Sequence, residues 1–297
     1  MVKHFIIDII LYTYAKIGQK DENIKKKSFS FLISIIYLYL WHQMFEKDNK
    51  QLCTRINRLF NEALKRYALV EDSDRILVGL SGGKDSMALL QLLALRSRIF
   101  KPRFNVEAAF VRMKNIPYQC DEEYLRSFAE SLGVRLHILD ATFSSNSSTT
   151  SQSSMLKVQS SKQKPHCFLC SWNRRKRLFS AAKELECNKI ALGHNKDDII
   201  QTALMNLTFE GTFSTMRPMM KMDKFDMTII RPLCLIREHD LQEYAEIQAF
   251  RKQVKNCPFE DASHRHDMKG IIAQLEEMNP EFSYSFFHAI MKDLNFK

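Results

Sequence analysis

Short apolar runs alternate along this chain with segments whose apolar residues recur at helical spacing. The runs have strand length, and they predict five strands, at Arg75–Leu80, Phe104–Val111, Val134–Leu139, Asn188–Leu192 and Met227–Pro232. Helices are expected between them, as at Asp121–Leu132, with Gly133 suited to its C-cap. Because strands that alternate with helices form right-handed crossovers, the pattern predicts an α/β fold, a parallel sheet with helices on both faces.

Helical periodicity also marks both sides of this region. Residues 44–72 predict an amphipathic N-terminal helix with an apolar stripe through Ile56, Phe60 and Ala63. Near the other end, Met268–Met278 and Pro280–Lys292 predict two closing helices, which form a small helical C-terminal region.

Residues 1–43 differ in composition from the remainder of the chain. Three lysines at 25–27 precede the run Ser28–Phe45, which contains no Asp, Glu, Lys or Arg. Basic residues before an apolar run are typical of a signal or an anchor, but about 18 residues is the lower limit for a membrane span. Three interpretations remain: an extension upstream of a translation start at Met44, a membrane anchor, or a helix packed on the domain. We favour the first, with which no membrane association is expected.

A glycine-bearing turn joins the first predicted strand to the helix after it. It comprises Ser81, Gly82, Gly83, Lys84, Asp85 and Ser86. Glycine permits close backbone approach to a ligand, and the start of a helix offers N–H groups and a positive dipole end to an anion. Lys84 adds a cation, whereas the carboxylate of Asp85 repels phosphate unless a metal ion lies between them. The turn therefore indicates a magnesium-nucleotide site, although neither the P-loop nor the dinucleotide fingerprint fits it.

A second group of polar residues follows the fourth predicted strand. His194, Asp197 and Asp198 come directly after it, and ligands of parallel sheets bind at the carboxyl ends of strands. We expect these residues to contact the nucleotide, its metal or the substrate. The acids also suit an N-cap and first helical turn, where the helix dipole favours them, and both roles can hold together.

Seven cysteines in 297 residues do not form a disulfide scaffold. Cys167 and Cys170 form a C-x-x-C pair, which indicates a metal site or a redox dithiol. The basic run 174–177 after the pair is either a nucleic-acid contact or a solvated helix face. The net charge of +10 suits a nucleic-acid partner but is weak evidence alone. The serine-rich stretch 143–161 is expected to be a mobile insertion.

Five segments taken together resemble one known family: SGGKDS, HCFLCSWNRRKRLF, ALGHNKDDIIQT, IIRPL and NCPFEDASHR. They resemble the tRNA 2-thiocytidine synthetase group of PP-loop ATP pyrophosphatases, over about Arg58 to Met291. The resemblance implies an adenine nucleotide α-hydrolase-like fold, with ATP and Mg²⁺ bound through Ser81–Ser86. It also implies a [4Fe–4S] cluster on Cys167, Cys170 and Cys257.

The resemblance further implies an ATP-dependent enzyme that thiolates a cytidine in the tRNA anticodon loop. Lys84, Asp85 and Asp198 are then the expected catalytic residues. The expected partners are tRNA, a sulfur donor such as a cysteine desulfurase and, as a further hypothesis, a second copy in a homodimer; the expected location is the cytoplasm. The ATP-binding domain is expected at 73–250, followed by a segment at 251–297 with the third cluster cysteine.

Two other functions remain as alternatives. One is a tRNA ligase of the lysidine synthetase type, in which an amine attacks the adenylated base; amine attack needs no soft metal ligands, so the three cysteines argue against it. The other is a non-catalytic tRNA-binding module held by zinc, with a histidine completing the site. Intact Lys84, Asp85 and Asp198 argue against that module.

Overall fold

The computed structural model describes residues 46–114, 120–142, 166–222, 226–251 and 264–293. The chain divides into two units between Thr54 and Arg55, and the sheet belongs to the second. A helix covers residues 46–66, and within the second unit it buries Ile56, Phe60 and Ala63. The predicted apolar stripe is thus confirmed.

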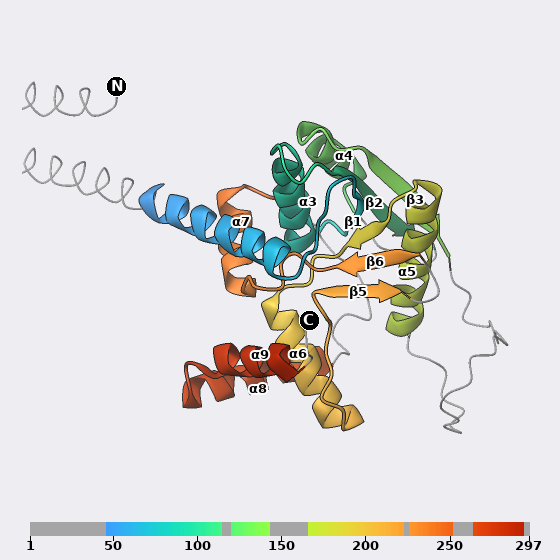
Figure 1. Cartoon of the computed structure of the whole chain (residues 1–297). Coiled ribbons are helices and arrows are strands. Elements are labelled where there is room, and N and C mark those ends of the chain that lie inside the picture. Colours follow the sequence, from blue (N-terminus) through green and yellow to red (C-terminus); the bar gives the residue numbers. More distant parts are fainter. Residues whose placement is uncertain (1–45, 115–119, 143–165, 223–225, 252–263, 294–297) are drawn as a thin grey trace, which may run out of the picture. The chain divides into compact units, whose positions relative to one another are not determined.

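The centre of the second unit is a six-stranded sheet in the order β3-β2-β1-β4-β6-β5 (Figure 1). The strands are β1 Arg75–Gly79, β2 Asn105–Met113, β3 Leu136–Ala141, β4 Lys189–Ala191, β5 Met219–Met222 and β6 Met227–Ile230. Every neighbouring pair is parallel except β5 with β6. The α/β fold and the five predicted strands are confirmed.

Strand β5 is the part of the sheet that the sequence pattern did not predict. It runs antiparallel to β6, with Met222 opposite Met227. The two strands are separated only by positions 223–226, too short for the crossover that a parallel pair needs. The sheet is therefore mostly parallel, as predicted, with one antiparallel strand at this edge.

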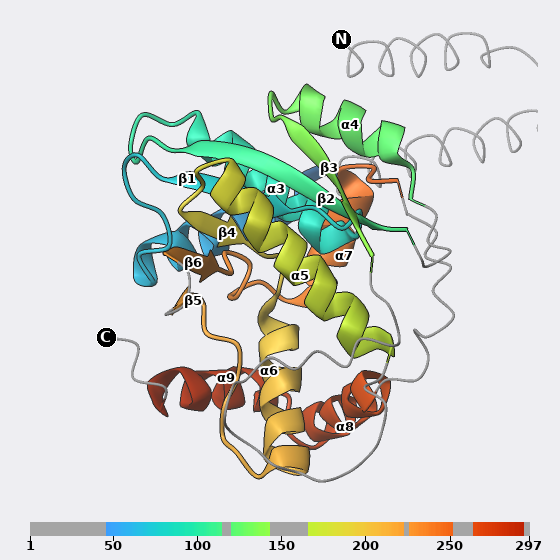
Figure 2. The same cartoon turned by 90° about the vertical axis from the view of Figure 1, so that its right-hand side faces the viewer.

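Helices cover both faces of the sheet (Figures 1 and 2). Their bounds are α3 Lys84–Ser97, α4 Glu122–Ser131, α5 His166–Glu184, α6 Lys196–Met205, α7 Glu238–Ile247, α8 His264–Met278 and α9 Phe282–Asp293, with a π-helical turn η1 at Asn206–Glu210. Helices α3 and α7 contact each other on one face, and α5 crosses the other against β2 and β3. Helices α6, α8 and α9 contact one another, which confirms the closing helices.

Helix α5 is held on the sheet by a buried apolar cluster. Leu178 and Ala182 of α5 belong to the same cluster as Leu77 of β1 and Ile190 of β4. Full burial of one such Leu or Ile side chain contributes roughly 1.5–3 kcal/mol. This packing fixes where the start of α5, with its cysteine pair and basic run, lies relative to the strand ends.

A buried ion pair lies at the amino end of β4. Lys189 and Asp74 are 6% and 3% exposed, and Lys189 Nζ lies 2.8 Å from Asp74 Oδ2. Lys189 Nζ also donates to the carbonyl of Leu69 at 3.1 Å. The Asn188 side-chain amide donates to Asp74 Oδ1 at 2.8 Å. Both charges are therefore compensated within the chain, as buried charges need to be.

Candidate functional site

The glycine-bearing turn joins β1 to α3 as predicted. Gly82 has φ +78°, a backbone conformation that favours glycine, and Gly83 is the N-cap of α3 without a side-chain cap. The hydroxyl of Ser86 donates to the carbonyl of Gly83 at 2.9 Å and accepts from the amide of Ser81 at 3.1 Å. Hydrogen bonds of Ser81 and Ser86 thus hold the turn in its conformation. Because no side chain caps α3, the positive end of its dipole can bind an anion.

Lys84 lies among carboxylates. Its Nζ is 3.3 Å from Asp85 Oδ2 and 3.4 Å from Glu238 Oε1, and Glu238 Oε2 is 2.8 Å from Nζ of Lys269 on α8. Burial lowers the pKa of Lys84, but the charges of Asp85 and Glu238 outweigh it, so the pKa is raised and the amine stays protonated. Sequence reasoning missed Glu238 and Lys269, because nothing local in α7 or α8 reveals that they reach the turn.

Asp85 has an oxygen without a partner. Its Oδ1 is buried and has no hydrogen bond in the part of the chain that the structure describes. Burial raises the pKa of Asp85; Lys84 opposes this, and the charge of Asp198 adds to it. Two mutually repelling carboxylates and an oxygen without a hydrogen bond are the donor set that a hard divalent cation prefers. The residues present fit Mg²⁺.

The segment after β4 presses against this turn. A Cβ on Gly193 would lie 3.1 Å from the carbonyl carbon of Asp85 and 3.1 Å from the amide nitrogen of Ser86, so no larger residue fits without a shift. Next to Gly193, the Nδ1 of His194 accepts from Arg231 Nε at 3.3 Å. The structure therefore brings the two predicted groups of residues together at the carboxyl ends of β1 and β4.

The two acids of this segment do different things. Asp198 Oδ2 accepts from the amide of Asn195, and Asn195 Oδ1 accepts from the amide of Asp198, at 2.9 and 3.0 Å, which forms a capping box at the start of α6. Asp197 instead holds the start of α7, with Oδ1 2.9 Å from Arg237 Nε and Oδ2 accepting from the amide of Glu238 at 2.6 Å. Both acids thus have structural roles. In addition, the negative charge of Asp198 raises the pKa of Asp85.

The cysteine pair opens α5. Cys167 and Cys170 are three residues apart in the sequence of this helix. Cys170 is half-buried. Cys257, the predicted third ligand, lies outside the residues that the structure describes, as do the serine-rich stretch 143–161 and residues 1–43. The convergence of Cys257 on the pair stays a prediction.

Four further cysteines lie in the part of the chain that the structure describes, and none belongs to a group of metal-ligating side chains there. Cys187 and Cys234 are buried, and burial raises the pKa of their thiols to about 11 and about 12. Both stay protonated at neutral pH and act as small apolar side chains. Cys53 and Cys120 are half-buried.

Among the described residues, no helix is long and apolar enough to cross a membrane.

Comparisons with known proteins identify the family of this chain. The PP-loop domain model matches residues 49–254. A protein of Pseudomonas putida named tRNA-cytidine(32) 2-sulfurtransferase is 31% identical over 245 residues, 82% of this chain and 85% of that protein. One of Bdellovibrio bacteriovorus with the same name is 34% identical over 230 residues, 77% of this chain and 84% of that protein.

A solved structure shares the fold. The U34-tRNA thiolase NcsA from Methanococcus maripaludis, solved with its [4Fe-4S] cluster, superimposes with a TM-score of 0.65 at 26% identity. The match covers 83% of this chain and 80% of that protein. The chain therefore belongs to the PP-loop domain family, in the group of the tRNA-cytidine(32) 2-sulfurtransferases.

Proposed function

We propose that this protein is an ATP-dependent tRNA sulfurtransferase that replaces a cytidine ring oxygen in the anticodon loop with sulfur. The relatives are named tRNA-cytidine(32) 2-sulfurtransferases, which supports sulfur transfer to a cytidine of tRNA. The proposal rests on three features of Asp85: a buried oxygen without a hydrogen bond, repulsion by the charge of Asp198, and an ion pair with Lys84. A magnesium-nucleotide site explains all three, because the metal compensates the acids and the phosphates compensate the lysine.

The proposed first step uses ATP at Ser81–Ser86. The ring oxygen of cytidine attacks the α-phosphorus, the new O–P bond forms, and the bond to the β-phosphate oxygen breaks with release of pyrophosphate. The N–H end of α3 and Lys84 stabilise the charge that develops on the phosphates. Asp85 and Asp198 would hold Mg²⁺, which acts there as a Lewis acid. The adenylated oxygen is then a good leaving group.

The second step needs a sulfur nucleophile, which expels AMP from the activated ring carbon. Cys167, Cys170 and Cys257 would hold a [4Fe–4S] cluster, and the thiolate donor set with helical i, i+3 spacing fits such a group. Held by these three thiolates, the cluster would supply iron that binds the incoming sulfur. The segment 251–297 contributes the third cysteine, and a donor such as a cysteine desulfurase supplies the sulfur in the cytoplasm.

A deletion strain tests the proposal. Mass spectrometry of its tRNA nucleosides should show loss of one thiolated cytidine, and the wild-type gene should restore it. Cys170→Ser should restore nothing, whereas Cys120→Ser, a half-buried cysteine outside the pair, should restore thiolation.

Anaerobically purified protein supplies the second measurement. Wild type and Cys120→Ser should contain iron and acid-labile sulfide, and Cys170→Ser should lose both. Pyrophosphate release should persist in Cys170→Ser, because activation precedes sulfur transfer. An unchanged set of thiolated nucleosides in the deletion strain would refute the proposed function.

A further inference from the structure

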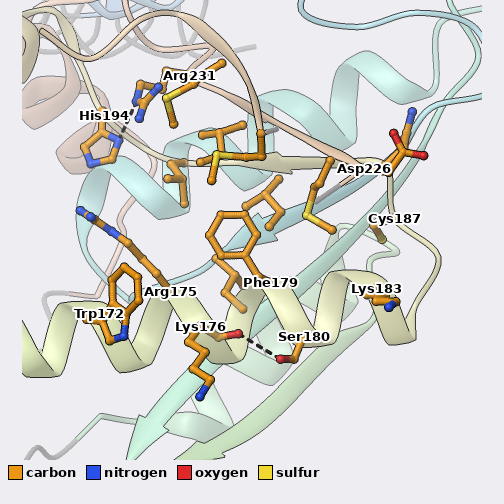
Figure 3. A pocket seen from close by; sticks show the side chains of 18 of the residues that line it. Trp172, Arg175, Lys176, Phe179, Ser180, Lys183, Cys187, His194, Asp226 and Arg231 are labelled. Carbon is orange, nitrogen blue, oxygen red and sulfur yellow. Dashed lines mark hydrogen bonds between the residues drawn. The ribbon is translucent and has the colours of Figure 1, made fainter. Parts of the chain in front are cut away.

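A cavity of about 820 Å³ lies between α5 and the β4-β6-β5 half of the sheet (Figure 3). A volume of several hundred Å³ is typical of a small-molecule site. Helix α5 supplies one wall through Trp172, Arg175 and Phe179, and the strands and the segments beside them supply the other. The ATP-binding turn Ser81–Ser86 does not line this cavity.

The body of the cavity is apolar. Leu192, Met220, Met227 and Ile229 line it opposite Phe179, which lies in the middle of the cavity in Figure 3. Methionine side chains adapt to irregular shapes and make favourable contacts with aromatic rings. Such a lining suits a flat ring with little polar surface on its faces.

One end of the cavity carries a buried cation. Arg231, 5% exposed, directs Nε to His194 Nδ1 and Nη1 to the carbonyl of Arg217, at 3.3 and 2.5 Å. It forms no ion pair with a carboxylate in the described part of the chain. Burial, and then the charge of Arg175, lower its pKa to about 10, so the guanidinium remains charged. A buried charge without a counter-charge costs stability, so an acceptor atom on a bound ligand would stabilise Arg231.

This end lies at the ATP-binding edge of the sheet. His194 follows Gly193, whose Cα approaches the Asp85–Ser86 backbone so closely that no Cβ fits freely. Trp172, 59% exposed, and Arg175 stand near the same end on α5 (Figure 3). An exposed aromatic beside cations is the combination that binds single-stranded nucleic acid, through stacking and phosphate contacts. The opposite end, where Lys183 and Asp226 lie in Figure 3, carries charges of both signs.

We propose that this cavity receives the nucleotide that is modified, extruded from a single-stranded RNA loop. The base lies in the apolar body against Phe179, and an acceptor atom on it takes hydrogen bonds from Arg231. Trp172 stacks on a neighbouring base, and Arg175 contacts a phosphate. This assignment rests on the proposed function for the identity of the RNA, whereas the cavity, its charge and its position are independent of that function.

Arg231→Met is the first test. Loss of an uncompensated buried charge should leave the melting temperature unchanged or raise it. Binding of a non-hydrolysable ATP analogue should stay unchanged, because Arg231 does not line the ATP turn. The kcat/KM for the tRNA in pyrophosphate release should fall by roughly tenfold or more, the size of one lost base contact. A lower melting temperature with normal tRNA kinetics would make Arg231 a structural residue and overturn the inference.

Trp172→Ala is a second test variant. Because Trp172 is exposed, its replacement should leave the packing of the core unchanged. Its affinity for an anticodon stem-loop RNA should fall about tenfold. Arg177→Ala is the matched control for Arg175→Ala, since both remove one charge from α5 but Arg177 does not line the cavity and pairs with Glu184 at 3.1 Å. Equal losses in both arginine variants would assign the effect to the general charge of α5 and overturn the inference.

Photocrosslinking separates this inference from the proposed function. A stem-loop RNA with 5-iodocytidine at the target position should crosslink to α5 at Trp172 or Phe179, or to the Met216–Met222 segment. Such a crosslink requires RNA binding but no thiolation, so it can be detected even if the protein has no thiolation activity. Crosslinks that map outside the cavity, in a wild-type protein that does thiolate tRNA, would overturn the cavity assignment and leave the function intact.

Discussion

Lys189 and Arg231 are two buried cations on neighbouring strands, and they differ in what compensates their charge. Lys189, at the amino end of β4, pairs with Asp74 at 2.8 Å and donates to a backbone carbonyl. Arg231, just after the carboxyl end of β6, has His194 and the carbonyl of Arg217 as its hydrogen-bond partners, and no described carboxylate pairs with it. Ligands of parallel sheets bind at the carboxyl ends of the strands. The comparison therefore indicates that Lys189 stabilises the fold, whereas Arg231 lies where a ligand can bind.

Lys84 is an intermediate case between these two. Its carboxylate contacts are at 3.3 and 3.4 Å, longer than the pair at Lys189, and its side chain is 24% exposed. Contacts this long and open are easily exchanged for phosphate oxygens. The three cations can therefore be ordered by how closely a carboxylate compensates their charge. Lys189 comes first and Lys84 second, and Arg231 comes last because no described carboxylate pairs with it.

Lys189→Met should have the largest effect on stability. Removing one member of a buried pair leaves Asp74 charged and uncompensated, which typically costs about 3–5 kcal/mol. Urea unfolding followed by circular dichroism measures this loss. The double variant Lys189→Met with Asp74→Leu should recover much of it, because no buried charge then remains. A single variant as stable as wild type would remove the distinction between Lys189 and Arg231.

Lys84→Ala and Asp85→Ala should abolish ATP-dependent pyrophosphate release and leave the fold intact. Loss of one contact to transition-state charge costs about 3 kcal/mol, roughly a hundredfold in rate. Pyrophosphate release measures the rate, and thermal melting measures the fold. Glu243→Gln, which removes a charge from α7 at a residue that pairs with His239, is the control. Near-normal release by both variants would take the turn out of the mechanism.

Glu238→Gln should have the smallest effect on ATP binding. It tests how strongly the carboxylate of Glu238 compensates the charge of Lys84. Without Glu238, Lys84 loses a competing carboxylate, so the KM for ATP should change by only a few-fold, as for exposed charge pairs. Burial raises the pKa of Glu238, but the Lys269 hydrogen bond and the Lys84 charge outweigh it, so the pKa lies below its ordinary value of 4.5.

The lowered pKa has a consequence for acid stability. Charged Glu238 stabilises the fold above pH 4.5, and this contribution disappears as the pH falls through its folded pKa. The glutamine variant should therefore lose less stability than wild type when the pH is lowered from neutral to about 3. Identical acid-unfolding curves would contradict the role assigned to Glu238.

The amino-acid sequence by itself determined the local parts of the site. The strand, the turn Ser81–Ser86 and the helix after it are continuous in the chain, and apolar periodicity with two glycines specifies them without distant contacts. The strands β1 to β4 and β6 were predictable for the same reason. The C-x-x-C pair is likewise local, although its third ligand, Cys257, stays a prediction.

Only the tertiary structure decided which distant residues meet. Glu238 reaches Lys84 from 154 positions away, and Arg231 reaches His194 from 37 positions away. Strand β5 and the cavity beneath α5 depend on how the sheet ends after β6. The physical reason is that hydrophobic periodicity encodes which face of an element is buried, whereas strand order and helix packing select the partners of each charge. Arg231 could have been suspected from its place near the carboxyl end of the predicted strand Met227–Pro232. That no described carboxylate pairs with it depends on the assembled fold.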